Sequence, residues 1–375
     1  MAGEHLPEDI IVKILSNLPV KSLIQFRCVS KRWRSIVSDP QFARLQFKVA
    51  SEQHTFSRRI LLSSGTTSQF ESLDLETPSP QANSSRSIRR PHLPFRPGSR
   101  VSLLCSCNGL VCVALDSTES FYIWNPSIGF THRLPDPFDS SKERLSHYGF
   151  GYVSATDDYK LVLGADAVDG LPGEVEVLEI FSLRARSWRR IEADPEDCIP
   201  ECQGVLLNEA LHWINMMGHW YALVDLDEDE LEVAEPFIIA FDLAREEFRK
   251  MPVPIIAKHN YGWTDVGVSC DGCLYVICST QLESLEFWVM REYGEGDSWT
   301  KLFNLNTCEP PEQIMYLTPA SAIVMLSTSL GLELVRIDHS EEKLGETSTV
   351  AARHMVPEHD MEMIGYEESL VWLSD

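Results

Sequence analysis

Apolar residues recur at helical spacing within residues 6–40, and no helical run of useful length appears beyond residue 100. The first predicted helix opens at Pro7, a residue type favoured at helix starts, and two acids follow it at the positive end of the helix dipole. One wide face of this helix is apolar and carries Ile10, Ile11, Ile14, Leu15 and Leu18. A second short helix is predicted over residues 20–27, and a third after the capping residue Ser30 as far as Pro40.

Three helices in so short a segment cannot bury enough surface to be stable by themselves. Their apolar residues also lie on more than one side of each helix, and the third helix carries Trp33, Ile36 and Val37. A helical module of this kind has a spare hydrophobic face, which predicts a binding partner. The alternative is that the face packs on the chain's own downstream domain.

Beyond residue 100, short β-rich segments alternate with turn residues, which is typical of an all-β domain. A hairpin with a polar turn recurs near residues 108, 158, 208, 271, 320 and 367, and a second β-rich unit follows each of the first five hairpins. A spacing of roughly 50 residues fits one four-stranded propeller blade per repeat. We therefore expect an α+β multidomain protein, with a small N-terminal three-helix module followed by an all-β propeller.

The sixth hairpin lacks its second unit, and the segments 59–62 and 70–75 have the pattern of the missing strands. If these N-terminal strands complete the last blade, they close the ring and remove its sheet edges. Six blades are favoured, and seven are the alternative. The expected domains are residues 1–48 for the helical module, 49–100 for the closing strands and a Ser/Pro/Arg-rich loop, and 101–375 for the propeller.

Charge is unevenly distributed, because residues 1–100 hold 15 Lys/Arg and 8 Asp/Glu whereas residues 101–375 hold 17 and 48. Nucleic-acid binding rests on Lys and Arg side chains that neutralise phosphates, so the acidic domain argues against it. The chain shows no secretory signal and no apolar stretch of membrane-spanning length. This predicts a cytoplasmic or nuclear protein with no membrane partner, whose 10 cysteines stay free in a reducing compartment.

Candidate chemistry is sparse. Cys270 and Cys273 have no second cysteine pair at zinc-knuckle spacing, and the Asp271-Gly272 between them is typical of a hairpin turn, so no metal is expected. His212 lies within an apolar strand and is interpreted as a core residue. The motifs of nucleophile elbows, phosphate-binding loops, zinc peptidases and calcium loops are absent, so we expect no cofactor and no enzymatic activity. An enzyme with acids at the propeller channel is the alternative, and no residue pattern favours it.

Three stretches resemble the F-box: Leu6-Pro7-Glu8-Asp9-Ile10, Leu18-Pro19-Val20-Lys21-Ser22-Leu23, and Phe26-Arg27-Cys28-Val29-Ser30-Lys31 followed by Trp33. The resemblance implies docking on a Skp adaptor, which joins the chain to a cullin and a RING subunit in a ubiquitin ligase. Carried over by position, the adaptor-binding residues are Leu6, Pro7, Ile10, Ile14, Leu15, Leu18, Pro19, Leu23, Phe26 and Val29. Trp33 and Ile36 are expected to hold the helices together.

A second resemblance covers most of residues 58–375, is clear through about residue 305, and is weak over 314–346. It is carried by Trp124-Asn-Pro-Ser127, by Gly149-Phe-Gly-Tyr152 with Asp157-Asp-Tyr-Lys160, and by Ser187-Trp-Arg-Arg190. These segments resemble the kelch-like, F-box-associated propeller domain that stands C-terminal to the F-box of plant F-box proteins. The Gly-Gly and Trp-Asp signatures of kelch and WD repeats are absent. The two resemblances together imply a non-catalytic subunit that captures a protein substrate for ubiquitination and degradation.

Propeller topology predicts that loops after the second and fourth strands of each blade share one face. The loops 165–174, 192–201 and 217–236 then bring 3, 5 and 7 acids to that face without a Lys or Arg. The candidate substrate-binding residues there are His219, Trp220, Tyr221, Tyr261, Trp263, Asp227 and Asp229. Aromatic anchors in an acidic surround favour a protein substrate with a basic segment. The alternative is that the aromatic residues fold onto their own blades and the acids are simply solvated. The arginine-bearing loop 78–99 shares the face and is a candidate to pair with the acids.

Two other function classes stay open. The propeller could bind a glycan or a small molecule, with Trp220 and Trp263 stacking on sugar rings. The chain could also hold the adaptor as a structural partner outside any ligase.

Overall fold

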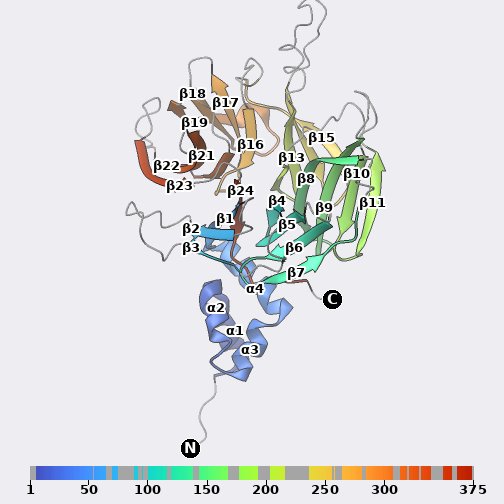
Figure 1. The fold of residues 1–375 in the computed structure, drawn as a ribbon, viewed down its shortest axis with the longest axis vertical. Helices are drawn as coiled ribbons and strands as arrows, with labels where there is room; N and C mark the ends of the chain where they lie inside the picture. Colours follow the sequence, from blue (N-terminus) through green and yellow to red (C-terminus); the bar gives the residue numbers. More distant parts are fainter. Residues whose placement is uncertain are drawn as a thin grey trace, which may run out of the picture. The chain divides into compact units, whose positions relative to one another are not determined.

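The computed structural model describes residues 6–53, 55–64, 70–74, 88–91, 95, 100–115, 120–137, 143–167, 177–192, 203–215, 236–255, 257, 264–280, 284–306, 313–318, 321–328, 331–338, 349–356 and 361–373. These residues form four α-helices and six four-stranded antiparallel sheets (Figure 1). The chain divides into two compact units, one of residues 1–78, 83–136 and 360–375 and the other of residues 79–82 and 137–359. The first unit holds the helices and two sheets, and the second holds four sheets.

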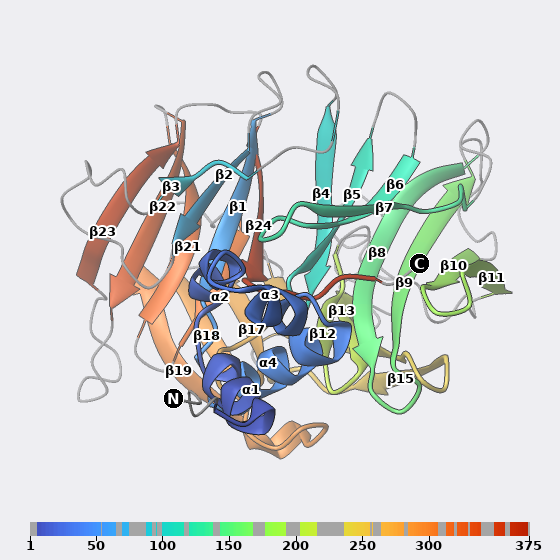
Figure 2. The ribbon, with the colours of Figure 1, turned by 90° about the horizontal axis from the view of Figure 1, so that it is seen from below.

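The helices are α1 (Glu8–Ser16), α2 (Val20–Phe26), α3 (Lys31–Val37) and α4 (Pro40–Glu52), gathered together in Figure 2. The predicted cap of α3 is confirmed, because the Ser30 side chain accepts a hydrogen bond from the Trp33 backbone N–H at 3.1 Å. The fourth helix was not predicted, since Pro40 was interpreted only as a stop. Asp39 caps α4 by accepting from the Gln41 N–H at 2.8 Å, and Pro40 takes the first helical position. Helix α4 therefore runs across the domain boundary expected at residue 48.

The helices share one apolar core, formed by Ile11, Leu15, Val20, Leu23, Ile36, Val37, Phe42 and Ala43. Trp33 packs against this core and meets Phe26 edge to face, with ring centroids 5.3 Å apart. One further core member, Leu370, belongs to a segment that follows the last strand of the described chain. The helical module is therefore completed by a residue more than 300 positions away in sequence.

The first unit contains two sheets. One consists of β4 (Val101–Cys107), β5 (Leu110–Leu115), β6 (Ser120–Asn125) and β7 (Phe130–Arg133) in sequence order. The other has the order β24 (Met361–Glu367), β1 (Arg58–Ser64), β2 (Phe70–Asp74) and β3 (Ile88–Arg89). Strand β1 pairs with β24 from Arg58 opposite Glu367 to Ser64 opposite Met361, so the predicted completion of the last blade by N-terminal strands is confirmed.

The expected partition of that blade is wrong in two details. No hairpin forms at residue 367, because residues 368–373 adopt no strand, and β3 lies in a segment that was expected to be a loop. Three strands that precede the first complete blade thus join one strand that follows the fifth. Arg89 and Arg90, from the predicted arginine-bearing loop, pair with Glu368 and Glu71 within this unit.

The second unit is built from four sheets. They comprise β8 (Glu143–Val153), β9 (Asp158–Ala167), β10 (Val177–Ser182) and β11 (Ser187–Glu192); β12 (Val205–Leu207), β13 (Ala210–Asn215), β14 (Phe237–Asp242) and β15 (Glu247–Met251); β16 (Thr264–Val268), β17 (Leu274–Thr280), β18 (Ser284–Met290) and β19 (Trp299–Asn306); and β20 (Gln313–Leu317), β21 (Ser321–Thr328), β22 (Gly331–Asp338) and β23 (Thr349–Val356). With the two sheets of the first unit they make six blades, so the predicted six-bladed propeller is confirmed, including the blade whose repeat is weakest in sequence.

Burial within a blade falls from its middle strands to its last. In the blade β12–β15, all residues of β13 are buried, whereas those of β15 are exposed or half-buried except for its last residue, Met251. His212 is fully buried on β13, as expected for a core histidine, and its Nε2 lies 2.7 Å from the Tyr293 hydroxyl. Burial lowers its pKa to about 4, so this histidine is neutral at physiological pH.

The described cysteines are free thiols, and Cys270 and Cys273 are half-buried beside the predicted turn. Within the described residues no group of three His, Cys, Asp or Glu side chains could hold a metal ion. No helix in that same part of the chain is long and apolar enough to cross a membrane.

The β4–β5 turn imposes a testable constraint at Gly109, where φ is +78°. A Cβ at this position would lie 2.3 Å from the Ser369 hydroxyl and 2.6 Å from the Glu367 carbonyl, so a side chain adds a steric clash to the backbone strain. Gly272, at φ +77°, has nothing within 4 Å of the same point. We expect Gly109→Ala to cost about 1–2 kcal/mol from the backbone plus about 1–3 kcal/mol from overpacking, and Gly272→Ala to cost the first amount alone. Urea unfolding of both variants measures the difference; equal losses would contradict the close packing.

Candidate functional site

Large apolar side chains are exposed at six described positions, and five of them belong to the helical module. These five are Leu6, Ile10, Ile14, Val29 and Leu45, and the sixth is Ile255 in the second unit. A single exposed apolar residue is ordinary, whereas a cluster marks an interaction site. The helical module therefore carries the strongest candidate docking surface in the described part of the chain.

Helix α1 and the residues just before it present three of these side chains. Ile10 and Ile14 are 40% and 50% exposed and lie on one side of the helix, since they are four residues apart, and Leu6, 56% exposed, lies two residues before the helix begins at Glu8. Ile11 and Leu15 point into the module's core. Helix α1 is thus apolar on two sides, as predicted, and one side is covered while the other is open. We call Leu6, Ile10 and Ile14 the α1 stripe.

The start of α3 lies at the beginning of this stripe. Arg32 contacts the Glu8 carboxylate and the Leu6 carbonyl oxygen, each at 3.5 Å. Val29 is three residues before Arg32 and 62% exposed. The turn between α2 and α3 thus carries an exposed apolar side chain of its own, and the first turn of α3 contacts the start of α1.

The ten predicted adaptor-binding residues separate into a surface set and a core set. Leu6, Pro7, Ile10, Ile14, Pro19 and Val29 are exposed, Leu18 and Phe26 are half-buried against the core, and Leu15 and Leu23 have no exposed surface. A partner can contact the first set directly. Leu15 and Leu23 support that surface from beneath by fixing how the helices pack.

The helical module carries an excess of positive charge at its surface. Residues 6–53 contain eight Lys or Arg against four Asp or Glu, and all eight of these cations are exposed. The described ion pairs of the module are Arg32 with Glu8 and Lys48 with Glu52, both at the surface. An acidic partner surface would complement this charge and speed the encounter.

The candidate substrate-binding residues His219, Trp220, Tyr221, Tyr261, Trp263, Asp227 and Asp229 lie outside the described residues. The same holds for most of the three acidic loops. Their role stays a prediction from the sequence.

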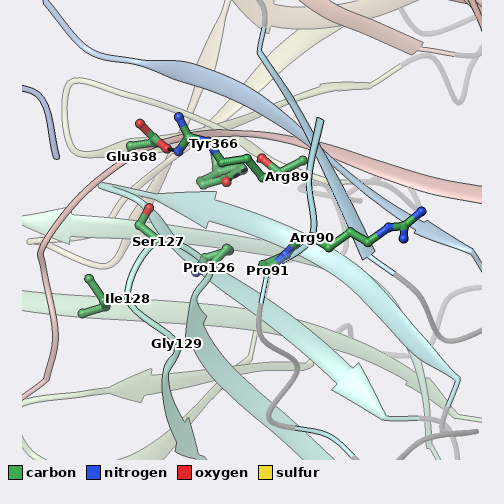
Figure 3. A pocket seen from close by; sticks show the side chains of 10 residues that line it. Arg89, Arg90, Pro91, Pro126, Ser127, Ile128, Gly129, Tyr366 and Glu368 are labelled. Carbon is green, nitrogen blue, oxygen red and sulfur yellow. Dashed lines mark hydrogen bonds and ion pairs between the residues drawn. The ribbon is translucent and has the colours of Figure 1, made fainter. Parts of the chain in front are cut away.

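A pocket of about 440 Å³ opens in the first unit (Figure 3). It is lined by Ser72, Arg89, Arg90, Pro91, Pro126, Ser127, Ile128, Gly129, Tyr366 and Glu368. Arg89 points to Glu368 and pairs with it, while Arg90 pairs with Glu71 at 3.1 Å. Burial raises the pKa of the Tyr366 phenol, whose hydroxyl lies 2.8 Å from that of Ser72. Charges at the pocket are therefore internally matched, and its lining does not point to a cofactor.

Sequence reasoning missed the contribution of Leu45 and of the segment 368–373. Leu45 is 40% exposed on α4, a helix that the proline at its start concealed. Leu370 joins the helical core, and no local pattern indicates this because the residue follows a strand of a distant blade. The signal that was available is Trp124-Asn-Pro-Ser127, whose Asn125 holds that segment.

Residues 59–369 match the family described as the F-box associated beta propeller domain, and residues 4–45 match the F-box domain. The F-box/kelch-repeat protein At3g23880 of Arabidopsis thaliana is 29% identical over 310 residues, covering 80% of this chain and 79% of that protein. The F-box protein CPR1 of the same plant is 30% identical over 340 residues, covering 84% and 76%. A solved nidogen/laminin complex chain has a TM-score of 0.45 at 9% identity, covering 83% of this chain and 99% of that one, and this likeness carries no functional argument.

A helical module with an open apolar stripe, joined to six four-stranded blades, defines the class of F-box proteins with a propeller domain. The chain belongs to the F-box-associated propeller family, with the F-box first and the propeller domain filling most of the remaining sequence.

The division between core and surface on α1 is testable with two neighbouring residues. Leu15→Ala should destabilise the helical module by about 2–5 kcal/mol, because it leaves a cavity in a fully buried site. Ile14→Ala should change stability by less than about 0.5 kcal/mol, because the side chain is half exposed. Hydrogen–deuterium exchange of the α1 and α4 amides in the full chain reports both. Similar protection losses in the two variants would contradict the assignment of Ile14 to the surface.

Proposed function

We propose that the chain is the substrate-recognition subunit of a Skp/cullin/F-box ubiquitin ligase. The α1 stripe carries this proposal, since its three aliphatic side chains stay exposed although the core beneath them is already filled, with Leu370 as one of its members. Because each is about half exposed, burying it against an adaptor would contribute roughly 1 kcal/mol. Membership of the F-box family supports the Skp adaptor as the protein that covers the stripe.

In this role the chain performs no bond-making chemistry. It holds a substrate lysine near a ubiquitin thioester formed elsewhere in the ligase, and so raises the effective concentration of the two reactants. Family membership and the described site agree with a non-catalytic subunit. The surroundings that suit such a ligase are the cytoplasm or the nucleus, and we propose one or both as the location.

The propeller is proposed to capture the substrate. The 48 acids beyond residue 100, against 17 Lys or Arg, support a protein substrate with a basic segment over an acidic one. The candidate aromatic residues, His219, Trp220 and Tyr221 in an acidic loop and Tyr261 and Trp263 in another loop of the same predicted face, would act as anchors, and the charge would steer the encounter.

Charge introduced into the α1 stripe tests the adaptor proposal. Ile10→Glu combined with Ile14→Glu should weaken adaptor binding by at least about 100-fold, roughly 3 kcal/mol, because two buried aliphatic contacts are lost and two carboxylates must be desolvated. Isothermal titration with a Skp adaptor measures the affinity, and a reconstituted ligase should lose ubiquitin transfer in parallel.

Ile255→Glu is the matched control, because Ile255 is 71% exposed in the second unit and far from the F-box in sequence. It should bind the adaptor as the unmodified chain does. Adaptor affinity that survives in the double variant would overturn the proposal.

Substitutions on the predicted substrate face should affect the substrate and spare the adaptor. Trp220→Ala with Asp227→Asn and Asp229→Asn should remove captured proteins from a quantitative pull-down by more than about tenfold, since one aromatic anchor contributes 2 kcal/mol or more at a hot spot. Adaptor affinity should stay unchanged. An identical set of captured proteins would show that these residues do not form the substrate site.

A further inference from the structure

The segment 368–373 forms neither helix nor strand, yet its first four residues are buried and its last two are half-buried. Glu368, Ser369, Leu370 and Val371 are 6%, 0%, 3% and 5% exposed. Irregular segments that follow the last strand of a domain are usually exposed unless something ties them down. We call residues 368–373 the strap.

Asn125, the last residue of β6, holds the strap to the blade formed by β4, β5, β6 and β7. Its Nδ2 lies 3.2 Å from the Ser369 carbonyl oxygen, 3.1 Å from the Ser369 hydroxyl and 2.7 Å from the Val371 carbonyl oxygen. Its Oδ1 accepts a hydrogen bond from the Ser127 N–H at 2.8 Å. Asn125 is fully buried, so an amide that donates to the strap and accepts from its own turn satisfies groups that water cannot reach.

Both the strap and the turn that Asn125 caps contact the core of the helical module. Leu370 of the strap lies in the module's core with Ile11, Leu15 and Phe42. Ile128, in the turn that Asn125 caps, packs against the same core. The strap is therefore bonded to a blade along its backbone and inserted into the F-box by its side chain.

The start of the strap is held to the other blade of the first unit. The Glu368 N–H donates to the Ser57 carbonyl oxygen at 2.9 Å, and Ser57 immediately precedes β1. The Glu368 carboxylate pairs with Arg89 and lies 4.0 Å from the fully buried Arg59 (Figure 3 shows the first pair). Ser57 is also the last residue of the short connection between α4 and β1, so this hydrogen bond joins the strap to the segment that leads from the helices.

We propose that the strap sets the orientation of the F-box helices on the two blades of the first unit, and that Asn125 is its positioning residue. The α4–β1 connection alone is a single tether, about which the helices could pivot. A core residue and a buried amide network add two further attachments and remove that freedom. The consequence for ubiquitin transfer rests on the proposed function, because a ligase needs its adaptor and substrate at a defined separation.

Two variants remove the tie while keeping the blades. Asn125→Asp retains the shape and the acceptor but replaces an amide with two N–H donors by a carboxyl that has no donor when ionised and only one when protonated, so it cannot satisfy both strap carbonyls. Deletion of residues 369–375 removes Leu370 and keeps β24, Glu368 and its ion pairs. Asn208→Asp is the matched control, because it makes the same chemical change at an exposed hairpin turn.

The primary measurement is the distribution of distances between spin labels at exposed positions 35 and 136, introduced in the full chain through unnatural amino acids. One narrow distance peak is expected for the unmodified chain and for Asn208→Asp, and a peak at least twice as broad for the two strap variants. Unchanged widths in the deletion variant would overturn the strap. Unchanged width in Asn125→Asp, with broadening in the deletion, would overturn the role of Asn125.

A second measurement separates positioning from folding. In a reconstituted ligase, adaptor affinity of Asn125→Asp should stay within twofold, because the α1 stripe is untouched, while ubiquitin spreads over more of the chain's own lysines. The lysines are mapped by mass spectrometry. An unchanged lysine pattern would overturn the effect on transfer. If the unmodified chain bound no adaptor, the proposed function would fail, and the distance measurement would still decide the strap.

Discussion

The burial of Leu370 in the core of the F-box helices is the contact on which the arrangement of the first unit depends. It places a residue that follows β24 among Ile11, Leu15 and Phe42, and so makes the last blade a neighbour of the first helix. The same blade is closed by β1, the strand that begins directly after the helices. The residues around β24 therefore have two roles. Strand β24 pairs with β1 and so closes the last blade, and Leu370, just after β24, attaches the helices to it.

This contact explains how a module of four short helices is held. Helices of seven to thirteen residues are marginal in isolation, and their stability comes from packing. The core takes in Leu370 and Ile128 from the blades, which leaves Leu6, Ile10 and Ile14 uncovered. The sequence left open whether the spare apolar face packs on the downstream domain or stays exposed. In the structure one side of the module packs on Leu370 and Ile128, and another side stays exposed.

Charged groups near the strap are arranged to satisfy one another rather than a ligand. Arg59 is fully buried and donates to the Ser72 hydroxyl and carbonyl oxygens at 2.6 and 2.7 Å, and Asp74 and Glu368 balance its charge. Burying a guanidinium is costly unless such partners are present. Arg89 and Glu368, which line the pocket beside them, pair with one another.

The sequence by itself determined the class of fold, because hydrophobic period and turn chemistry are local properties. The helical spacing of Ile10, Ile14 and Leu15, the Ser30 cap and the first five of the six hairpin turns each depend on a few neighbouring residues, and these predictions are confirmed. The helix α4 was not predicted, because Asp39-Pro40 was interpreted only as the end of α3, whereas the same two residues also begin α4. Only the tertiary structure decided that Leu15 is covered while Ile14 is open, and that Asn125 holds residues 369–371. Those outcomes depend on contacts between segments more than 200 residues apart, and no periodicity along the chain records them.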